Sequence, residues 1–417
     1  MRLLQVFLDE AEVGELQEHE GLWRFSYADS WRASSSAFDL SPAIARAAGT
    51  VIDGSSVRPV QWFFDNLLPE EGARLLLARD AGVEQADAFG LLACYGAESA
   101  GALTLLPPDG QLETGGLLAL TDHHLSERIR ALPRISLTGN APKRMSLAGA
   151  QHKLAVSIRE GLLFEPVGSY PSTYILKPDH PDTEGYPHSV VNEWFAMSVA
   201  RHAGLTVPEV EIRRVPEPVY LIQRFDRTFG EEPAKRLYVL DACQLLGIGA
   251  IWKYQKATLE TLAQILDLCR FKAATRIALF RWLVFNLLIG NNDSHLKNLS
   301  FFVKPDGVEL APHYDLLCTA VYSPANDWLG SDLVWKLGGM RCHADVTRAS
   351  VLEMAAALGV PTSLATRELD KLCATVPAGA AHWYTTYMQQ LSAGEARLVR
   401  QIIHGVMKDM LARLGPG

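Results

Sequence analysis

The sequence predicts an α+β protein with a β-rich N-terminal module, a mixed lobe rich in strands, and a mainly helical C-terminal lobe. Two observations lead to this prediction. Short β-like runs between Gly and polar turns occupy the first fifty residues and return from about residue 133, whereas helical periodicity dominates from about residue 240. No repeat or low-complexity tract interrupts this order. We therefore expect three parts, at residues 1–108, 109–225 and 226–417.

The composition is that of an ordinary globular chain. Of its 417 residues, 48% are hydrophobic and 21% are charged, which suffices for two or three domains with a sizeable core. The formal net charge of −8 and the pI near 5.9 argue against a chain that holds nucleic acid by its own overall field. We therefore expect any contact with DNA to need a partner.

Cysteine usage and hydropathy indicate a cytoplasmic protein. The six cysteines lie far apart with no C-x-x-C pair, and no charged n-region followed by an apolar h-region opens the chain. The most apolar stretch, 277–289, is shorter than the roughly 20 residues that span a bilayer and contains Arg281 and Asn286. We expect this stretch to be a buried helix, with no membrane partner.

The N-terminal module begins with β-like runs at residues 3–9 and 22–28 and continues into helices. The run 60–82 puts Phe63, Phe64, Leu67 and Leu68 on one helical face, and Pro69 marks the start of a second helix. Residues 87–96 end on a Gly stop, and residues 106–116 combine Pro, Gly and Asp into the best candidate for a linker.

The middle of the chain reads as strands around one helix. Residues 151–168 predict a hairpin that turns at Glu160-Gly161, and residues 172–180 predict a short strand that ends in Lys177 and Pro178. A helix is expected at about 190–203, followed by two further strand-like runs. Beyond residue 240, two stretches break the helical pattern: the polar run IGNNDSHLKNLSFF (289–302) and the run GVELAPHYDLL (307–317).

The polar run contains a spacing that is typical of phosphoryl transfer. Asn298 follows Asp293 at the fifth position, as in a protein-kinase catalytic loop, where the Asp accepts the proton of the substrate hydroxyl and the Asn ligates Mg²⁺. His295 lies between them. A solvated turn can carry the same residues, so the test is whether the other parts of such a site follow in the right order.

The other parts do occur in order. Asp315 ends an apolar strand-like run and supplies a second carboxylate for the metal. Lys177 ends a strand upstream, and Glu193 in the next helix is a possible anchor for it, as in the lysine–glutamate pair of kinases. The small-residue turn Ala148-Gly149-Ala150 offers backbone N–H groups to a phosphate, although a plain hairpin entry looks the same. Alone, Lys177 and Glu193 read as exposed polar residues; together and in order they favour a kinase site.

With these residues in place, the chain resembles the HipA-type serine/threonine kinases, which are toxins of bacterial toxin–antitoxin pairs. The resemblance covers nearly the whole chain, and its most diagnostic elements are SLAGAQHK and DSHLKN. Further segments match in the same order: FFDNLLPE, DAFGLLACYGAESAGALTLLP, YILKPDH, VNEWFAMSVARHAGLTVPEVEI, LIQRFDR, DACQLLGI with KYQ, PHYDLL and WKLGG. The resemblance implies a protein-kinase-like bilobal fold.

The resemblance also implies a role for each matching residue. Asp293 is implied as the catalytic base, Asn298 and Asp315 as Mg²⁺ ligands, and Lys177, paired with Glu193, as the contact to the ATP phosphates. His295 and Lys297 brace the catalytic loop or neutralise the transferring phosphate. The implied ATP-binding set also contains Ala148, Gly149 and Ala150 in the phosphate-binding loop and Gln223, Arg224, Phe225 and Asp226 in the hinge that lines adenine and ribose.

Regulation and partners are implied in the same way. Ser146 matches the autophosphorylated serine whose modification ejects the phosphate-binding loop, since a phosphate with nearly two negative charges is repelled by ATP phosphates. The implied partners are a helix-turn-helix antitoxin of the HipB type, operator DNA bound mainly through that antitoxin, and a protein substrate that is a translation component such as an aminoacyl-tRNA synthetase. A small-molecule phosphotransferase and a non-catalytic antitoxin- and operator-binding protein remain as alternatives.

Two positions depart from the usual family pattern. His152 stands where members often have Glu, and Gln223 where a Glu can precede the hinge Arg-Phe-Asp. Neither is a position of proton transfer, and the second metal motif keeps its carboxylate at Asp315. The residues that the chemistry needs are therefore all present.

Overall fold

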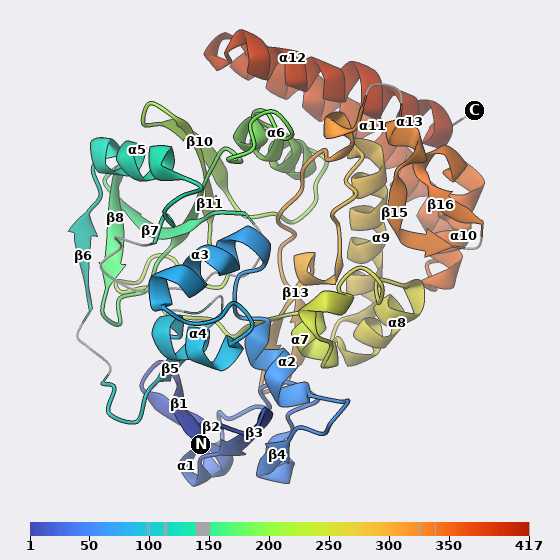
Figure 1. Ribbon diagram of the computed structural model, residues 1–417. Coiled ribbons are helices and arrows are strands. Elements are labelled where there is room, and N and C mark those ends of the chain that lie inside the picture. The colour runs from blue at the N-terminus through green and yellow to red at the C-terminus, as the bar shows by residue number, and fades with distance from the viewer. Residues whose placement is uncertain are drawn as a thin grey trace. The chain divides into compact units, whose positions relative to one another are not determined.

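The computed structural model of the chain divides into two compact units (Figure 1). The strand-rich unit comprises Met1–Pro181, Arg213–Trp252 and Ser300–Val308, and the helical unit comprises Asp182–Ile212, Lys253–Leu299 and Glu309–Gly417. The structure describes residues 1–97, 99, 101–111, 115–138, 151–324, 327–337 and 339–416. The predicted α+β class is confirmed, with a β-rich N-terminal part and a helical C-terminal part.

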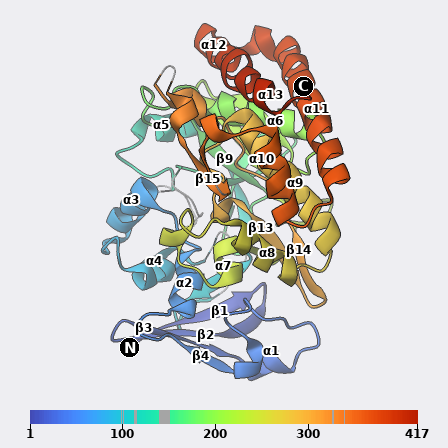
Figure 2. The same cartoon turned by 90° about the vertical axis from the view of Figure 1, so that its right-hand side faces the viewer.

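The N-terminal sheet is antiparallel, with strand order β4-β3-β2-β1-β5. Alternate residues point inward, so that Leu4 and Val6 of β1 are buried, as the alternating sequence predicts. Helix α1 contacts β2 and helix α2 contacts β3 (Figure 2). The strands are β1 (Arg2–Leu8), β2 (Ala11–His19), β3 (Leu22–Tyr27), β4 (Thr50–Ile52) and β5 (Leu103–Leu106).

A second, six-stranded sheet has the order β10-β11-β9-β7-β8-β6. The hairpin predicted at Glu160-Gly161 is confirmed: both residues have positive φ, 50° and 77°, which suits a tight two-residue turn. Leu154, Leu176 and Leu221 from three neighbouring strands form its apolar core with Leu125 of helix α5. The strands are β6 (Gly116–Ala119), β7 (Leu154–Arg159), β8 (Leu162–Val167), β9 (Tyr174–Pro178), β10 (Val210–Arg214) and β11 (Pro218–Gln223).

The remaining strands form two small sheets. One has the order β12-β13-β14, with β12 (Val239–Asp241), β13 (Ser300–Lys304) and β14 (Gly307–Leu310); the other pairs β15 (Asp332–Leu337) with β16 (Met340–Cys342). The helices of the strand-rich unit are α1 (Asp29–Ala33), α2 (Pro59–Asp65), α3 (Glu71–Ala81), α4 (Ala88–Tyr95), α5 (Asp122–Ala131) and α7 (Ala242–Leu246). Of the predicted linker, residues 112–114 lie outside the described residues.

The core of the helical unit forms around α9 (Lys272–Ile289). Its second half is apolar on nearly every side and is buried, so the helix predicted at 277–289 is confirmed. Helix α11 (Thr362–Tyr387) packs against both α9 and α6 (Ser189–His202), and Trp383 of α11 meets Trp194 and Phe195 at ring-centroid distances of 4.7 and 5.1 Å. The other helices are α8 (Leu259–Leu268), α10 (Arg348–Ala357), α12 (Ala393–Gln401) and α13 (Lys408–Leu414), with a π-helical segment at Ile402–Met407.

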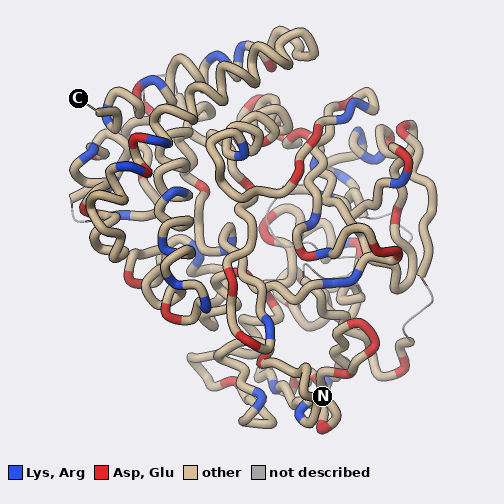
Figure 3. The backbone as a smooth tube through the Cα atoms, turned by 180° about the vertical axis from the view of Figure 1, so that it is seen from behind, with Lys and Arg blue, Asp and Glu red and all other residues tan. Residues whose placement is uncertain are grey.

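The distribution of charged residues along the chain and the hydropathy of its helices agree with the composition. Acidic and basic residues are interspersed along the described chain in the view of Figure 3. Within the part of the chain that the structure describes, no helix combines the length and the apolar character needed to cross a membrane.

Two separate constraints require a glycine at position 290, where helix α9 ends. Gly290 has φ 66° and its N–H caps the helix in the left-handed conformation, which side chains with a Cβ rarely adopt. A Cβ at this position would also lie 2.5 Å from Val406 Cγ1 and 2.8 Å from Ala320 Cβ. The polar run that follows therefore starts from a fixed point.

We expect Gly290→Ala to lower the free energy of unfolding by about 2–5 kcal/mol, because the left-handed conformation and the overpacking both cost stability. Gly82→Ala is the matched control. Gly82 caps α3 with φ 68°, but the place that a Cβ would take there is open, with no neighbouring atom within 4 Å, so its cost is about 1–2 kcal/mol. Urea unfolding of both variants tests this, and equal losses would contradict the packing argument.

Candidate active site

The polar run after α9 is an ordered loop of the helical unit. Asp293 keeps 41% of its side-chain surface exposed, whereas His295, Lys297 and Asn298 are buried. A short 3-10 turn, Leu296–Asn298, ends the loop. The solvated-turn interpretation therefore does not describe it, because most of its polar residues lie inside the protein.

Asparagine side chains close the main chain of this loop. Asn291 Oδ1 accepts a hydrogen bond from the N–H of Asp293 at 2.9 Å, and its Nδ2 donates to Asn286 Oδ1 of α9 at 2.8 Å. Asn298 Nδ2 donates to the carbonyl of Asp293 at 2.7 Å, and the N–H of His295 donates to the same carbonyl at 2.8 Å. Asp293 is thus held on both sides by groups that belong to the loop or to α9.

Neighbouring segments of the helical unit hold the rest of the loop. Trp335 Nε1 donates to the carbonyl of Ser294 at 2.6 Å, and the hydroxyl of Tyr314 donates to the carbonyl of Lys297 at 2.7 Å. The N–H of Leu296 donates to the carbonyl of Lys253 at 3.3 Å. These contacts come from β15, from the segment that carries Asp315, and from the segment before α8.

The carboxylate of Asp293 faces a phenol and an imidazole. The hydroxyl of Tyr254 donates a hydrogen bond to Asp293 Oδ1, and His295 Nε2 lies 3.8 Å from the same oxygen. The Tyr254 ring also meets the His295 ring edge-on, with centroids 4.9 Å apart and planes at 78°. Oδ1 is therefore already arranged to accept a hydrogen bond from a hydroxyl group.

Asp315 has an unusual backbone conformation. Its φ is 58°, the left-handed region that non-glycine residues rarely occupy but that Asp tolerates better than most. Strained backbone of this kind is enriched at functional sites. The hydroxyl of its neighbour Tyr314 donates to the carbonyl of Lys297, so the segment that carries Asp315 is attached to the loop that carries Asp293 and Asn298.

Glu193 lies on α6 and is buried, with 3% of its surface exposed. The residue before it, Asn192, exchanges hydrogen bonds of 2.8 Å with both the N–H and the carbonyl of Cys318 and donates to the hydroxyl of Tyr322. Helix α6 is thereby attached to the segment that follows Asp315. Lys177, the predicted partner of Glu193, belongs to the strand-rich unit, and the pairing of these two residues stays a prediction.

Lys177 lies on β9 and is also buried, at 6% exposure. It is opposite Tyr220 in the antiparallel ladder, and its Nζ lies 5.7 Å from the centroid of the Tyr220 ring. A lysine that is buried at a strand end is not the exposed residue that its sequence context alone suggests. The predicted loop residues Ser146, Ala148, Gly149 and Ala150 lie outside the described residues.

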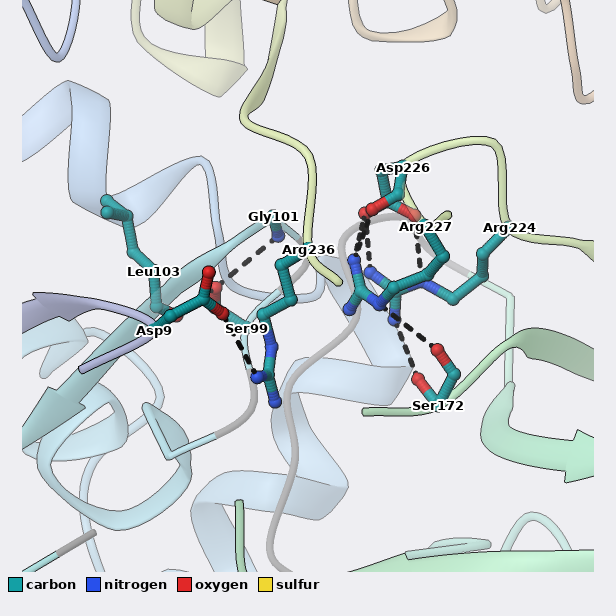
Figure 4. A network of polar contacts seen from close by, with 9 residues as sticks. All are labelled: Asp9, Ser99, Gly101, Leu103, Ser172, Arg224, Asp226, Arg227 and Arg236. Atoms are coloured by element: carbon teal, nitrogen blue, oxygen red, sulfur yellow. Dashed lines mark hydrogen bonds and ion pairs between the residues drawn. The ribbon is translucent and has the colours of Figure 1, made fainter. Parts of the chain in front are cut away.

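The predicted hinge, 223–226, begins at the last residue of β11 and contains a buried ion network (Figure 4). Arg224 binds Asp226 through Nε and Nη2 at 2.9 and 2.6 Å, and Arg227 Nη1 lies 2.9 Å from Asp226 Oδ2. Arg224 Nη1 donates to Ser172 Oγ at 3.1 Å, and Arg227 Nε donates to the carbonyl of Ser172 at 3.1 Å. Burial alone raises the pKa of Asp226, but the two guanidinium groups hold this pKa below its usual range.

The four hinge residues differ in burial. Arg224 and Asp226 are buried and bind each other, whereas Gln223 and Phe225 are partly exposed, with the Phe225 ring 6.1 Å from that of Phe302. The sequence did not predict a role for Arg227, the last residue of LIQRFDR. It also gave no role to Tyr254, although the motif KYQ that contains it is part of the resemblance. No feature of the sequence singles out Ser172.

The residues near Asp293 fit a magnesium ion. Asn298 Nδ2 donates to the Asp293 carbonyl, and this bond fixes the orientation of the Asn298 side-chain amide. The other end of that amide, Asn298 Oδ1, is the atom that could bind a cation. Mg²⁺ prefers such oxygens together with carboxylates, and it usually takes one or two protein ligands beside phosphate and water. Among the described residues no cluster of three or more His, Cys, Asp or Glu could hold a metal by itself, and a site of this type does not need one.

Comparison with known proteins identifies the family. Residues 145–380 match the model of the HipA-like C-terminal domain, and residues 4–106 match the HipA N-terminal domain. The chain belongs to the HipA family. Because the first match alone covers more than half of the chain, the predicted resemblance is confirmed.

Relatives from two organisms agree with this assignment. The HipA serine/threonine-protein kinase toxin of Shewanella oneidensis is 28% identical over 400 residues, 91% of this chain and 88% of that protein. The provisionally named kinase Y4mE of Sinorhizobium fredii is 34% identical over 336 residues, 77% of this chain and 78% of that protein. HipA in the Shewanella oneidensis MR-1 complex of HipA, HipB and operator DNA superposes with a TM-score of 0.83 at 26% identity, covering 99% of this chain and 97% of that one. This HipA-family chain is therefore a kinase of the serine/threonine type.

We expect Asp226→Asn to lower the free energy of unfolding by about 3–5 kcal/mol at neutral pH, because it leaves two buried guanidinium groups without their counter-ion. Asp226 has a lower pKa when folded, so its contribution is present above its unfolded pKa of about 3.9 and is lost as the pH falls further. The variant should therefore lose less stability than the parent on acidification below about pH 4.

Urea unfolding at neutral and acidic pH measures both effects. Asp122→Asn is the matched control, because Asp122 forms a 2.9 Å pair with Arg213 in the same unit but is 49% exposed, and its loss should stay at ~0.2–1 kcal/mol. A loss for Asp226→Asn that is no larger than that of the control would contradict the structural role of the network.

Proposed function

We propose that this HipA-family kinase transfers the γ-phosphoryl group of ATP, with Mg²⁺, to serine or threonine hydroxyls of a protein and thereby acts as a growth-arresting toxin. The observation that carries the proposal is the arrangement around Asp293: a carboxylate in a loop closed by asparagine side chains, with a hydroxyl group already bonded to its Oδ1. Phosphoryl transfer depends mainly on positioning and electrostatics, and such a loop supplies positioning.

Each residue of the loop has a part in this proposal. Asp293 accepts the proton of the attacking hydroxyl, and His295, 3.8 Å from its carboxylate, braces it. Asn298 and Asp315 hold Mg²⁺, which neutralises charge on the phosphates when it is bound. Lys297 is buried in the same turn and adds a positive charge to the loop.

The ATP-binding part of the proposal keeps the residues that the resemblance implies. Lys177, buried on β9, contacts the phosphates, and Glu193 is its partner. The segment Gln223–Asp226 lines adenine and ribose. Because the side chains of Arg224 and Asp226 bind each other, we assign them to holding this segment in shape, and the nucleotide contacts to Gln223, Phe225 and the backbone. Ala148, Gly149 and Ala150 cover the phosphates, and Ser146 is the site of inactivating autophosphorylation.

The partners in the proposal follow from the family. A HipB-like helix-turn-helix antitoxin binds the kinase and brings it to operator DNA, which agrees with the net charge of −8 on this chain. The protein substrate is a translation component, with an aminoacyl-tRNA synthetase as the first choice, and the site of action is the cytoplasm.

We expect Asp293→Asn to reduce phosphate transfer by about 10²- to 10⁴-fold, since it removes the proton acceptor with almost no change in volume. The experiment incubates the full chain with labelled ATP and Mg²⁺, alone and in cell lysate, and maps phosphate by mass spectrometry. The parent protein should gain phosphate on Ser146 and label proteins in the lysate.

Asp267→Asn is the control, because Asp267 is 83% exposed on α8 of the same unit. Full transfer by Asp293→Asn would exclude Asp293 as the base. Label in small molecules and not in proteins would overturn the protein substrate, and phosphate only at sites other than Ser146 would overturn the autophosphorylation proposal.

A further inference from the structure

Tyr254 holds a position that the proposed chemistry does not explain. Its hydroxyl donates to Asp293 Oδ1, and its ring lies edge-on to His295. The preceding residue, Lys253, accepts a backbone hydrogen bond from Leu296, so this segment is attached to the loop by its main chain as well. Both Tyr254, at 46% exposure, and the Asp293 side chain, at 41%, remain accessible to water.

The exposure of the two groups argues against a role in packing. A buried tyrosine hydroxyl needs a partner because leaving it unpaired costs stability, but a half-exposed phenol and a half-exposed carboxylate can both bind water instead. What the contact does change is the chemistry at Oδ1. It places the hydroxyl hydrogen of Tyr254 against Oδ1, the oxygen that would receive the proton of the acceptor hydroxyl.

We infer that Tyr254 is a specificity gate: its phenol holds the acceptor position at Asp293 until the hydroxyl of a protein substrate displaces it. The inference rests on the proposed function, because it takes Asp293 as the base. The acceptor class is a serine or threonine hydroxyl presented on a polypeptide, which brings contacts of its own that compensate for the displaced phenol. A single water molecule brings no such contacts.

The gate therefore suppresses hydrolysis of ATP. In that side reaction a water oxygen forms a bond to the γ-phosphorus, the bond from this phosphorus to the bridging oxygen of ADP breaks, and the proton of the water passes to Asp293. A phenol bonded to Oδ1 occupies the place that this water needs. Kinases exclude water from the site to prevent such loss of ATP, and here one side chain performs that task in the absence of substrate.

The test is the rate of ADP formation with ATP and Mg²⁺ and no added protein acceptor, measured in full chains that all carry Ser146→Ala, which removes the proposed internal acceptor. Tyr254→Phe keeps the ring against His295 and removes only the hydroxyl, so its hydrolysis rate should rise by roughly 2- to 10-fold, the amount that one net hydrogen bond is worth. The double variant Tyr254→Phe with Asp293→Asn should show no such rise. Tyr384→Phe is the matched control, because it removes a phenol hydroxyl that bonds Arg400 at 2.8 Å in the same unit.

A second measurement does not depend on activity. In nucleotide-free protein labelled with ¹³C at tyrosine Cζ, the resonance missing from Tyr254→Phe identifies the phenol, and it should shift in Asp293→Asn but not in Asp267→Asn. An unmoved resonance, or a hydrolysis rate in Tyr254→Phe that is unchanged or lower, would overturn the gate. If Asp293→Asn still transfers phosphate to protein, the proposed function itself fails; if that variant is inactive and Tyr254→Phe behaves as the parent does, only the gate fails.

Discussion

The hydrogen bond from the N–H of Asp293 to the side chain of Asn291 is the contact on which the candidate site depends. At this point the chain has left α9 and has not yet entered β13, so no regular secondary structure fixes its direction. Asn291 replaces that missing support, since it is bonded both to Asp293 and to Asn286 of α9. Asn298 closes the loop from the other side through the Asp293 carbonyl. The buried helix α9 therefore fixes the position of the Asp293 carboxylate through the side chains of Asn286 and Asn291.

Other contacts in the helical unit keep α9 and the neighbouring segments fixed. Helix α9 is buried along its second half and ends at a glycine that no larger residue can replace without displacing Val406 or Ala320. Asn192 of α6 fixes the backbone at Cys318, just beyond the strained Asp315. The buried Arg224–Asp226–Arg227 network plays the corresponding part in the strand-rich unit, where charged residues of the predicted hinge hold the backbone in shape.

The sequence predicted most of the elements because their signals are local. Apolar periodicity located α9 and α6, and the Glu160-Gly161 pair located a hairpin whose turn requires positive φ. The spacing of Asp293 and Asn298 also located the candidate loop. What could not be predicted are contacts between distant segments: Tyr254 with Asp293, Arg227 with Ser172, and Asn192 with Cys318. Such contacts follow from tertiary packing, which leaves no periodic trace in the residues involved.

The central claim is that the loop holds Asp293 in place before any ligand binds. Amide hydrogen exchange of the nucleotide-free chain tests it most directly, with the N–H of Asp293 compared between the parent protein and Asn291→Ala. We expect this amide to be protected in the parent and to exchange at least about tenfold faster in the variant, while the amides in the buried half of α9 are unchanged. Equal and rapid exchange of the Asp293 amide in both proteins would contradict the claim.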